Sequence, residues 1–153
     1  MQVNLMERTM DTHIAQRVQD SFIRQPVLVA IGATLARVQP GEVTIELPIR
    51  AELTQQHGFV HAGIITLIAD TACGYAALTR MPPTAAVLSV EFKVNLLSPA
   101  IGEKLIARGW VIKPGKTLTV CMAEVHSLNG GEDKLVAMML ATMTAREDMG
   151  LVG

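Results

Sequence analysis

The chain has 153 residues, the usual length of one domain, so a hydrophobic core can form without disulfide bonds. Thirteen Lys and Arg against fourteen Asp and Glu give a net charge of −1, and only three Phe, one Tyr and one Trp are present. This composition excludes a basic groove with stacking aromatic side chains, so nucleic acid is not an expected partner. With 50% hydrophobic and 18% charged residues, we expect a homo-oligomer, because one protomer would leave apolar surface uncovered.

The location expected from the sequence is the cytoplasm. Charged residues interrupt positions 1–20, so no apolar run typical of a signal peptide occurs there. The most apolar stretch, 62–79, carries Asp70 at its centre, where a charge inside a bilayer costs about 3 kcal/mol. Cys73 and Cys121 lack CxxC spacing, and we expect them to be buried free thiols. They indicate neither a disulfide nor a metal site.

The first predicted elements are a helix and a hairpin. Apolar residues recur every four positions over 7–23, which predicts an amphipathic helix, and the chain is expected to break at Pro26. A turn at Pro40-Gly41 separates two predicted strands, at 34–38 and 43–49.

The second half of the chain predicts a buried helix and four strands. After a loop at 52–60, residues 62–79 are apolar in every helical direction, which indicates a helix buried on all sides. Turn residues then separate four strand-like segments, at 86–96, 103–112, 117–127 and 134–146.

The strand at 86–96 alternates in polarity, as expected for a sheet covered on one side. Its apolar face comprises Val90, Phe92, Val94 and Leu96. Its polar face comprises Ser89, Glu91, Lys93 and Asn95.

The order of elements predicts an α+β fold, in which one curled antiparallel sheet of five to six strands wraps one long buried helix. A short helix precedes this unit. The expected parts are an N-terminal helical segment at 1–32, the main domain at 33–147 and a C-terminal tail at 148–153. The edges of such a sheet also favour dimerisation.

Asp70 is the strongest chemical signal, because it is the only charged side chain other than histidine between Glu52 and Arg80. A carboxylate removed from water has a raised pKa, which prepares it to act as a base or nucleophile. A structural Asp at a dimer interface, bonded to backbone or Thr hydroxyls, is the alternative interpretation, and the residues alone leave both open.

His61 comes immediately before the predicted helix, beside Ala62 and Gly63. Free N–H groups and the helix dipole at this position can polarise a carbonyl oxygen. The alternative is that His61 only shapes the turn. His57 lies four residues before His61, but no carboxylate ligand accompanies the pair, so no metal is expected.

Other polar residues are weaker candidates. Gln55 and Gln56 could orient water or a carbonyl group, and Lys93, Arg108, Lys113 and Lys116 could meet phosphates. The sequence contains no GxSxG, GxGxxG or CxxCH motif and no complete P-loop, which disfavours serine hydrolase, Rossmann, haem and nucleotide-hydrolysing proteins.

His61-Ala62-Gly63, followed by Leu67 and by Asp70-Thr71-Ala72, resembles the helix signature of hotdog-fold acyl-CoA thioesterases, in particular the phenylacetate-degradation (PaaI-like) type. The resemblance continues through 89–95, through Ser98-Pro99-Ala100 with Gly102, and through Gly115-Lys116-Thr117. It covers roughly Thr34 to Arg146.

The resemblance implies hydrolysis of a small aryl or short- to medium-chain acyl-CoA to a free acid and CoA, without a cofactor. Asp70 would be the general base or nucleophile, the N–H groups of Ala62 and Gly63 the oxyanion hole, and His61 would order that turn. Gln55 would orient the carbonyl or water, and Ser89 of the other subunit would lie near the catalytic water. Residues implied to bind substrate or CoA are Asn95, Ser98, Pro99, Lys113, Lys116 and Thr117.

The resemblance also implies edge-to-edge dimers or tetramers with active sites at the dimer interface. Two alternatives remain open: a hotdog hydratase or dehydratase acting on acyl thioesters, and a non-catalytic dimer that binds CoA esters. The position of the acid inside the helix, nine residues after His61, favours the thioesterase.

Overall fold

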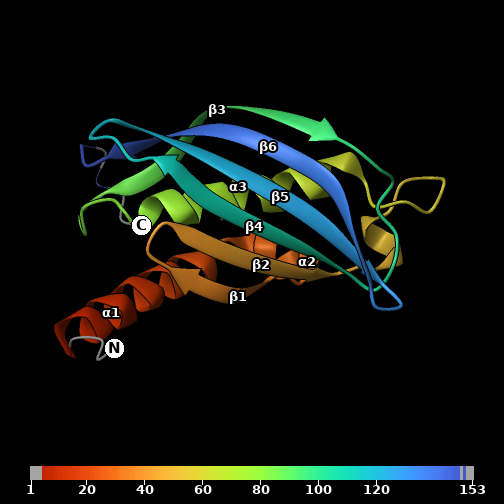
Figure 1. Ribbon diagram of the computed structural model, residues 1–153, viewed down its shortest axis with the longest axis horizontal. Helices are drawn as coiled ribbons and strands as arrows, with labels where there is room; N and C mark the ends of the chain where they lie inside the picture. The colour runs from red at the N-terminus through yellow and green to blue at the C-terminus, as the bar shows by residue number, and fades with distance from the viewer. Residues whose placement is uncertain (1–4, 149, 151–153) are drawn as a thin grey trace.

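A computed structural model describes the backbone of residues 5–148 and 150 and, within these, the side chains of residues 12–148 (Figure 1). The strands are β1 (Thr34–Gln39), β2 (Glu42–Pro48), β3 (Ala86–Leu96), β4 (Lys104–Lys113), β5 (Leu118–Asn129) and β6 (Glu132–Arg146). The helices are α1 (Leu5–Phe22), α2 (Pro26–Ile31), the 3-10 turn η1 (Ala51–Leu53) and α3 (Ala62–Leu78). Among these described residues, no helix is long and apolar enough to cross a bilayer.

The six strands form one antiparallel sheet in the order β1-β2-β4-β5-β6-β3. The sheet curls around α3, while α1 lies beside the β1 end (Figure 1). The α+β prediction with a sheet around one long helix is confirmed, and the predicted elements match the observed ones to within two residues at each end. The strands at the two edges are β1 and β3.

We predicted that the helical chain breaks at Pro26, but a second, short helix begins at this residue. Residues 23–25 form a turn, and the short helix α2 then starts at Pro26 and ends at Ile31, with Gly32 as its C-cap residue at a φ of 80°. Proline suits the first position of a helix, because its fixed φ is helical and its missing N–H would have no partner there.

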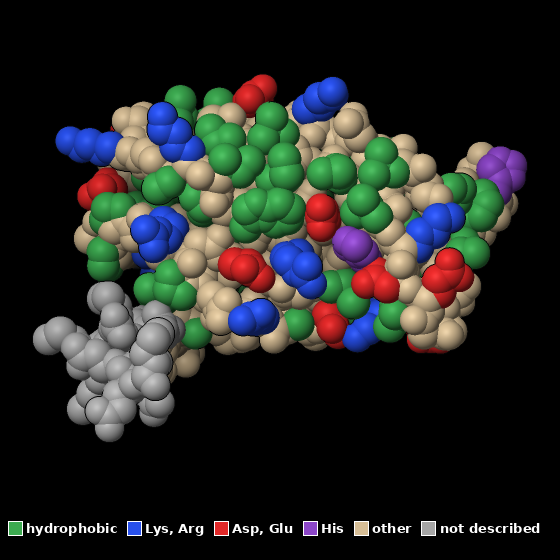
Figure 2. All heavy atoms as spheres, in the orientation of Figure 1, with side chains coloured by type: hydrophobic (Ala, Val, Ile, Leu, Met, Phe, Trp, Pro, Cys, Tyr) green, Lys and Arg blue, Asp and Glu red, His purple; other side chains and the backbone are tan. Residues whose placement is uncertain are grey.

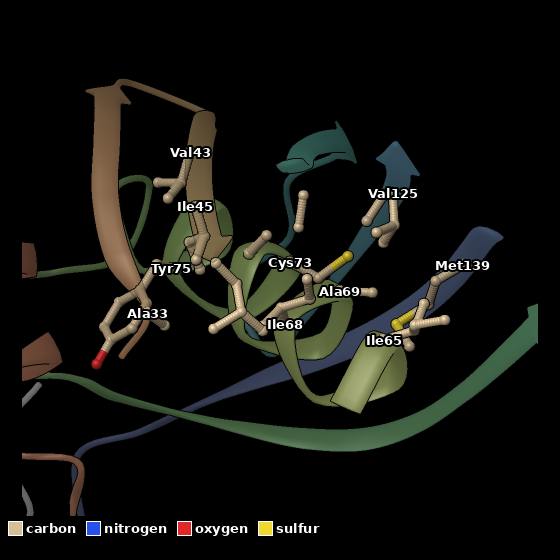
Figure 3. Close-up of a cluster of buried hydrophobic side chains, with 14 of the residues drawn as sticks. Ala33, Val43, Ile45, Ile65, Ile68, Ala69, Cys73, Tyr75, Val125 and Met139 are labelled. Carbon is tan, nitrogen blue, oxygen red and sulfur yellow. The ribbon is translucent and has the colours of Figure 1, made fainter. Parts of the chain in front are cut away.

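The core lies between α3 and the inner face of the sheet. Figure 3 shows Ile68 and Cys73 of α3 among buried side chains of β2 and β5. At Gly109 of β4, an added Cβ would lie only 2.4 Å from the carbonyl carbon of Ala72, so helix and strand are in direct backbone contact. Cys73 and Cys121 are buried free thiols, as predicted, and burial raises the pKa of Cys121 to about 12.

The N-terminal helix is joined to the end of α3 by Arg17. Its guanidinium donates to the carbonyl oxygens of Met81, at 3.2 Å, and Ala85, at 2.5 Å, just beyond the C-terminus of α3. A cation at this position complements the negative end of the helix dipole. The segment before the sheet is therefore fixed to the helix that the sheet surrounds.

The prediction that α3 is buried on all sides is wrong for one stripe. Ile65, Ile68 and most residues of the second half are buried, but Ile64, Leu67, Asp70 and Gly74 stay half-exposed. These four positions follow one another at intervals of three or four residues, so they lie on one side of the helix. The first turn, at Ala62 and Gly63, is exposed.

The prediction that Ser89 lies on the same face of β3 as Glu91 is also wrong. Ser89 pairs with Met143 and Glu91 with Thr142, so the register shifts by one residue at Val90. This bulge places Ser89 on the inner face, toward α3, instead of on the face of Glu91. Because β3 is an edge strand, its apolar residues are not covered as predicted: Val90, Phe92 and Leu96 are 54%, 44% and 50% exposed.

Hydrophobic side chains also gather on the outer face of the sheet, over β3, β6 and β5 (Figure 2). Leu88, Leu118 and Leu140 are among the exposed residues of these strands. A large apolar surface of this kind is typical of a site of protein association, which supports the expectation of a homo-oligomer.

Two glycines provide a matched test of the packing. Gly109→Ala is expected to lower the free energy of unfolding by about 1–3 kcal/mol, because the new methyl group overlaps the backbone of α3. Gly74→Ala is expected to raise it by about 0.5–1 kcal/mol, because a Cβ there meets nothing within 4 Å and glycine weakens a helix interior. Urea unfolding measures both changes. A Gly109→Ala protein as stable as wild type would contradict the close contact.

Candidate active site

The N-terminus of α3 presents one free backbone donor. His61 is the N-cap residue, and its Nδ1 accepts a hydrogen bond from the Gly63 N–H at 2.8 Å. The Ile64 N–H donates to the His61 carbonyl oxygen at 2.9 Å. Within the described part of the chain, the Ala62 N–H has no acceptor. Of the two donors predicted for an oxyanion hole, only that of Ala62 is available, because the imidazole of His61 occupies the other.

The loop before α3 holds Gln55 beside this donor. The Gln55 N–H donates to the Phe59 carbonyl at 2.8 Å, and the Gly58 N–H donates to the Gln55 carbonyl at 2.9 Å, which closes a tight turn. The His57 N–H donates to Oε1 of Gln55, so Nε2 is the end of this amide left for a ligand. Gly58 has φ of 82°, a conformation that favours glycine.

A cavity of about 480 Å³ opens in front of the helix N-terminus. One wall comes from the loop and the first turn of α3, and the other from the segment that follows β3. Residues along it include Gln55, His61, Ala62, Leu97, Ser98 and Pro99. The structure therefore brings together five residues that the sequence analysis selected for catalysis or substrate binding.

Asp70 lies at the middle of α3, with its carboxylate facing β3. The Ser89 hydroxyl donates to Oδ1 of Asp70 at 2.7 Å, which the bulge at Val90 makes possible. Burial raises the pKa of Asp70, and the hydrogen bond from Ser89 opposes this rise in part. Both residues line a second cavity, of about 180 Å³. The resemblance places Ser89 near the catalytic water from the other subunit, whereas here its hydroxyl contacts Asp70 of the same protomer.

One protomer does not bring Asp70 and Ala62 together. Asp70 follows Ala62 by eight positions in α3, which corresponds to about 12 Å along the helix axis. A group that attacks a thioester carbon and a donor to its oxygen must both lie roughly 3 Å from the reacting atoms. These two groups therefore line separate cavities in the single chain.

Four predicted binding residues lie away from both cavities. Asn95 pairs with Met138 on the outer face of the sheet. Lys113, Lys116 and Thr117 lie at and after the end of β4; the last two are beside Met81, which follows the C-terminus of α3. The role of these four residues in binding CoA stays a prediction.

The sequence analysis missed the residues that close the second cavity. Gln25, in the turn before α2, donates from Nε2 to the Tyr75 hydroxyl at 2.7 Å, and both line the cavity with Asp70. Gly74 also lines it. The sequence alone leaves two roles open for Gly74, room for an acyl group or close packing of the helix, whereas no local pattern connects Gln25 with Asp70.

Comparisons with known proteins agree with this architecture. Residues 57–134 match the model of the thioesterase superfamily. A crystal structure of a thioesterase family protein from Silicibacter pomeroyi is 49% identical, with a TM-score of 0.86 over 92% of this chain and 99% of that one. Human acyl-coenzyme A thioesterase 13 is 31% identical over 68% of this chain and 73% of its own length. The PaaI protein of Escherichia coli, from the phenylacetic acid degradation operon, shares the fold, with a TM-score of 0.80 at 20% identity over 90% of this chain and 96% of that one.

The chain belongs to the thioesterase superfamily and has the hotdog fold. This assignment agrees with the family that its helix signature resembles. The chain spans 66% of the length of each of two archaeal relatives that it matches.

The raised pKa of Asp70 predicts a pH-dependent cost to stability. The folded protein holds the Asp70 proton more tightly than the unfolded chain does, so this group destabilises the fold as pH rises from the unfolded pKa through the folded one. Asp70→Asn keeps an acceptor for Ser89 but removes the charge. We expect it to be more stable than wild type at neutral pH, and we expect this advantage to shrink near pH ~4, where the wild-type carboxyl is increasingly protonated in both states.

Urea unfolding of both proteins at the two pH values measures this difference. Ser89→Ala is the control, because loss of its hydrogen bond raises the pKa of Asp70 further and strengthens the loss of stability at neutral pH. A stability difference between Asp70→Asn and wild type that is the same at both pH values would contradict the raised pKa.

Proposed function

We propose that the protein hydrolyses the thioester of an acyl-CoA with a short- to medium-chain or small aryl acyl group, and releases the free acid and CoA. The observation that carries this proposal is Asp70, a half-buried carboxylate with a raised pKa and a fixed orientation, in the helix of a thioesterase-superfamily fold. The likeness to acyl-coenzyme A thioesterase 13 supports the choice of a CoA ester.

The carboxylate supplies the attacking group. Its Oδ1 accepts the hydrogen bond from Ser89, which leaves Oδ2 to act as a base for water or as a nucleophile. By the first route, water loses a proton to Asp70 and its oxygen bonds to the carbonyl carbon. By the second, Asp70 forms an anhydride that water then cleaves. In both, the C–S bond breaks and the thiolate of CoA takes a proton. In the second, water attacks the acyl carbon of the anhydride, so the acid keeps the oxygen of water and Asp70 is released as the carboxylate. A raised pKa makes the carboxylate a stronger base near neutral pH.

The helix N-terminus stabilises the charge that forms on the carbonyl oxygen. The Ala62 N–H is the available donor, the positive end of the helix dipole adds to it, and Nε2 of Gln55 lies along the same cavity. His61 keeps the first turn in shape through its bond to Gly63. Water and these side chains suffice for the reaction, so the proposal includes neither a metal nor an organic cofactor.

A complete site needs a second copy of the chain, because Asp70 and Ala62 are too far apart in one protomer. The 11-residue edge strand β3 offers unpaired backbone groups and exposed apolar residues to such a copy. Antiparallel pairing of two β3 strands about a two-fold axis would turn the N-terminus of one α3 toward the middle of the other. We therefore propose a homodimer in which Ala62 of one protomer and Asp70 of its partner share a site, with the outer sheet face available to join two dimers. A cytoplasmic location is part of this proposal, supported by the buried free thiols.

The activity is tested by thiol release from a panel of acyl-CoA esters. Asp70→Asn is expected to lower kcat by at least about 10³-fold, because the attacking group is lost. Ala62→Pro is expected to lower it by about 10²–10³-fold, because proline deletes the free N–H at a helix position that it otherwise suits. Ala62→Gly keeps the N–H and is the matched control, expected to stay within roughly tenfold of wild type.

Wild-type rates in folded Asp70→Asn would overturn the role of the carboxylate. Absence of thiol release from every ester, with water added to crotonyl-CoA, would replace the thioesterase by a hydratase. Tight binding of acyl-CoA without any turnover would support the binding dimer instead.

Mixing inactive subunits tests the shared site. A heterodimer of Asp70→Asn and Ala62→Pro protomers contains one site with both wild-type groups and one with neither. Random exchange makes half of the dimers mixed, so activity is expected to return to about a quarter of the wild-type value. The assay is thiol release after the two variants are unfolded together and refolded, with each variant refolded alone as the control. No recovery in mixtures shown to contain heterodimers would place the complete site within one protomer.

A further inference from the structure

The cavity beside Asp70 extends away from the helix N-terminus. It lies between α3 and β3, and its volume is about 180 Å³. Its lining consists of Gln25, Asp70, Thr71, Gly74, Tyr75, Val87, Leu88 and Ser89. A cavity of about 150 Å³ is large enough for a benzene molecule, so this space can hold one ring or about six carbon atoms.

Gly74 keeps this cavity open. It lies one turn of helix after Asp70, on the same half-exposed stripe, and a Cβ there would meet nothing within 4 Å. Glycine inside a helix costs roughly 0.5–1 kcal/mol relative to alanine, and no neighbour in the described protomer requires its small size. Gly109 differs, because a Cβ there would overlap the backbone of α3. The space at Gly74 is therefore left for something other than the packing of the protomer.

Gln25 and Tyr75 contribute a polar wall to the cavity. Gln25 donates from Nε2 to the Tyr75 hydroxyl at 2.7 Å, and this hydroxyl donates to Oγ of Ser21 at 3.2 Å. These bonds fix the Gln25 amide, and its Oε1 has no partner among the described residues. A methyl group that reached this wall would displace water from a polar group without replacing its hydrogen bond, which costs free energy. The wall therefore limits how far an apolar chain can extend.

We propose that this cavity holds the acyl group of the substrate, that Gly74 provides its width, and that Gln25 sets its length at about six carbon atoms. The inference rests on the proposed function, because it places the thioester carbon at Asp70. It assigns short chains and single rings, rather than long fatty chains, as the preferred acyl class. It also gives the segment before the sheet a role in specificity, because that segment supplies Gln25.

Substitutions at Gly74 test the width. The measured quantity is kcat/KM for hexanoyl-CoA divided by kcat/KM for acetyl-CoA. Gly74→Ala is expected to lower this ratio and Gly74→Leu to lower it further, by at least about tenfold, because the new side chain occupies the space of the longer acyl group. Circular dichroism and sedimentation confirm that each variant is folded and assembled like wild type. An unchanged ratio in a folded Gly74→Leu protein would overturn the assignment.

Substitution of Gln25 tests the length. Gln25→Leu leaves the Tyr75 hydroxyl bonded to Ser21 and makes the end wall apolar. Over the series from acetyl- to decanoyl-CoA, we expect its highest kcat/KM to move to a longer chain than in wild type. Gln19→Leu makes the same exchange at an exposed position of α1 and is expected to keep the wild-type profile. Identical profiles in both variants would contradict the end wall.

A binding measurement separates this inference from the proposed function. S-hexyl-CoA is a thioether that cannot be hydrolysed, and S-ethyl-CoA is its short counterpart. By calorimetry, wild type is expected to bind the hexyl compound at least about tenfold more tightly, and Gly74→Leu is expected to lose this preference. If no ester is hydrolysed but these affinities hold, the proposed function fails while the acyl site stands. If esters are hydrolysed but the preference is the same in Gly74→Leu, the acyl site fails alone.

Discussion

Burial of α3 inside the curl of the sheet is the constraint on which the other features depend. The backbone contact between Gly109 and Ala72 sets the separation of helix and strand. Because the sheet closes around most of the helix, the residues of α3 beyond Thr66 are half-exposed on one side alone, and the single carboxylate of the helix lies on that side. The same packing that stabilises the fold thus removes Asp70 from bulk water far enough to raise its pKa.

The half-exposed stripe and the unpaired edge strand β3 have a common consequence. Each leaves a need that one protomer does not meet. The edge strand β3 lacks a hydrogen-bonding neighbour, and Asp70 lacks a nearby N–H donor for the carbonyl oxygen, which an acyl transfer requires. Association of two copies through β3 would satisfy both needs at once. Folding, assembly and proposed catalysis then depend on the same contacts. The burial that lowers the stability of the fold at Asp70 also makes this carboxylate a stronger base.

The N-terminal segment completes the molecule in two places. Arg17 binds the carbonyl groups beyond the C-terminus of α3, which attaches α1 to the end of the buried helix. A few residues later, Gln25 reaches Tyr75 and closes the cavity beside Asp70. A segment outside the sheet can therefore change which acyl group is accepted while the groups proposed to react stay the same.

The sequence by itself determined the six strands, the helices α1 and α3 and their order, and it indicated Asp70 and the N-terminus of α3 as candidate reactive groups. Periodicity is a local property, so strands and helices followed from it to within two residues, and a lone carboxylate in an apolar helix indicated Asp70. Only the tertiary structure decided that the bulge at Val90 turns Ser89 toward Asp70, that His61 leaves Ala62 as the one free donor, and that Gln25 closes the second cavity. The reason is that alternation and spacing describe neighbours along the chain, whereas register shifts and contacts across 50 residues depend on how the elements pack.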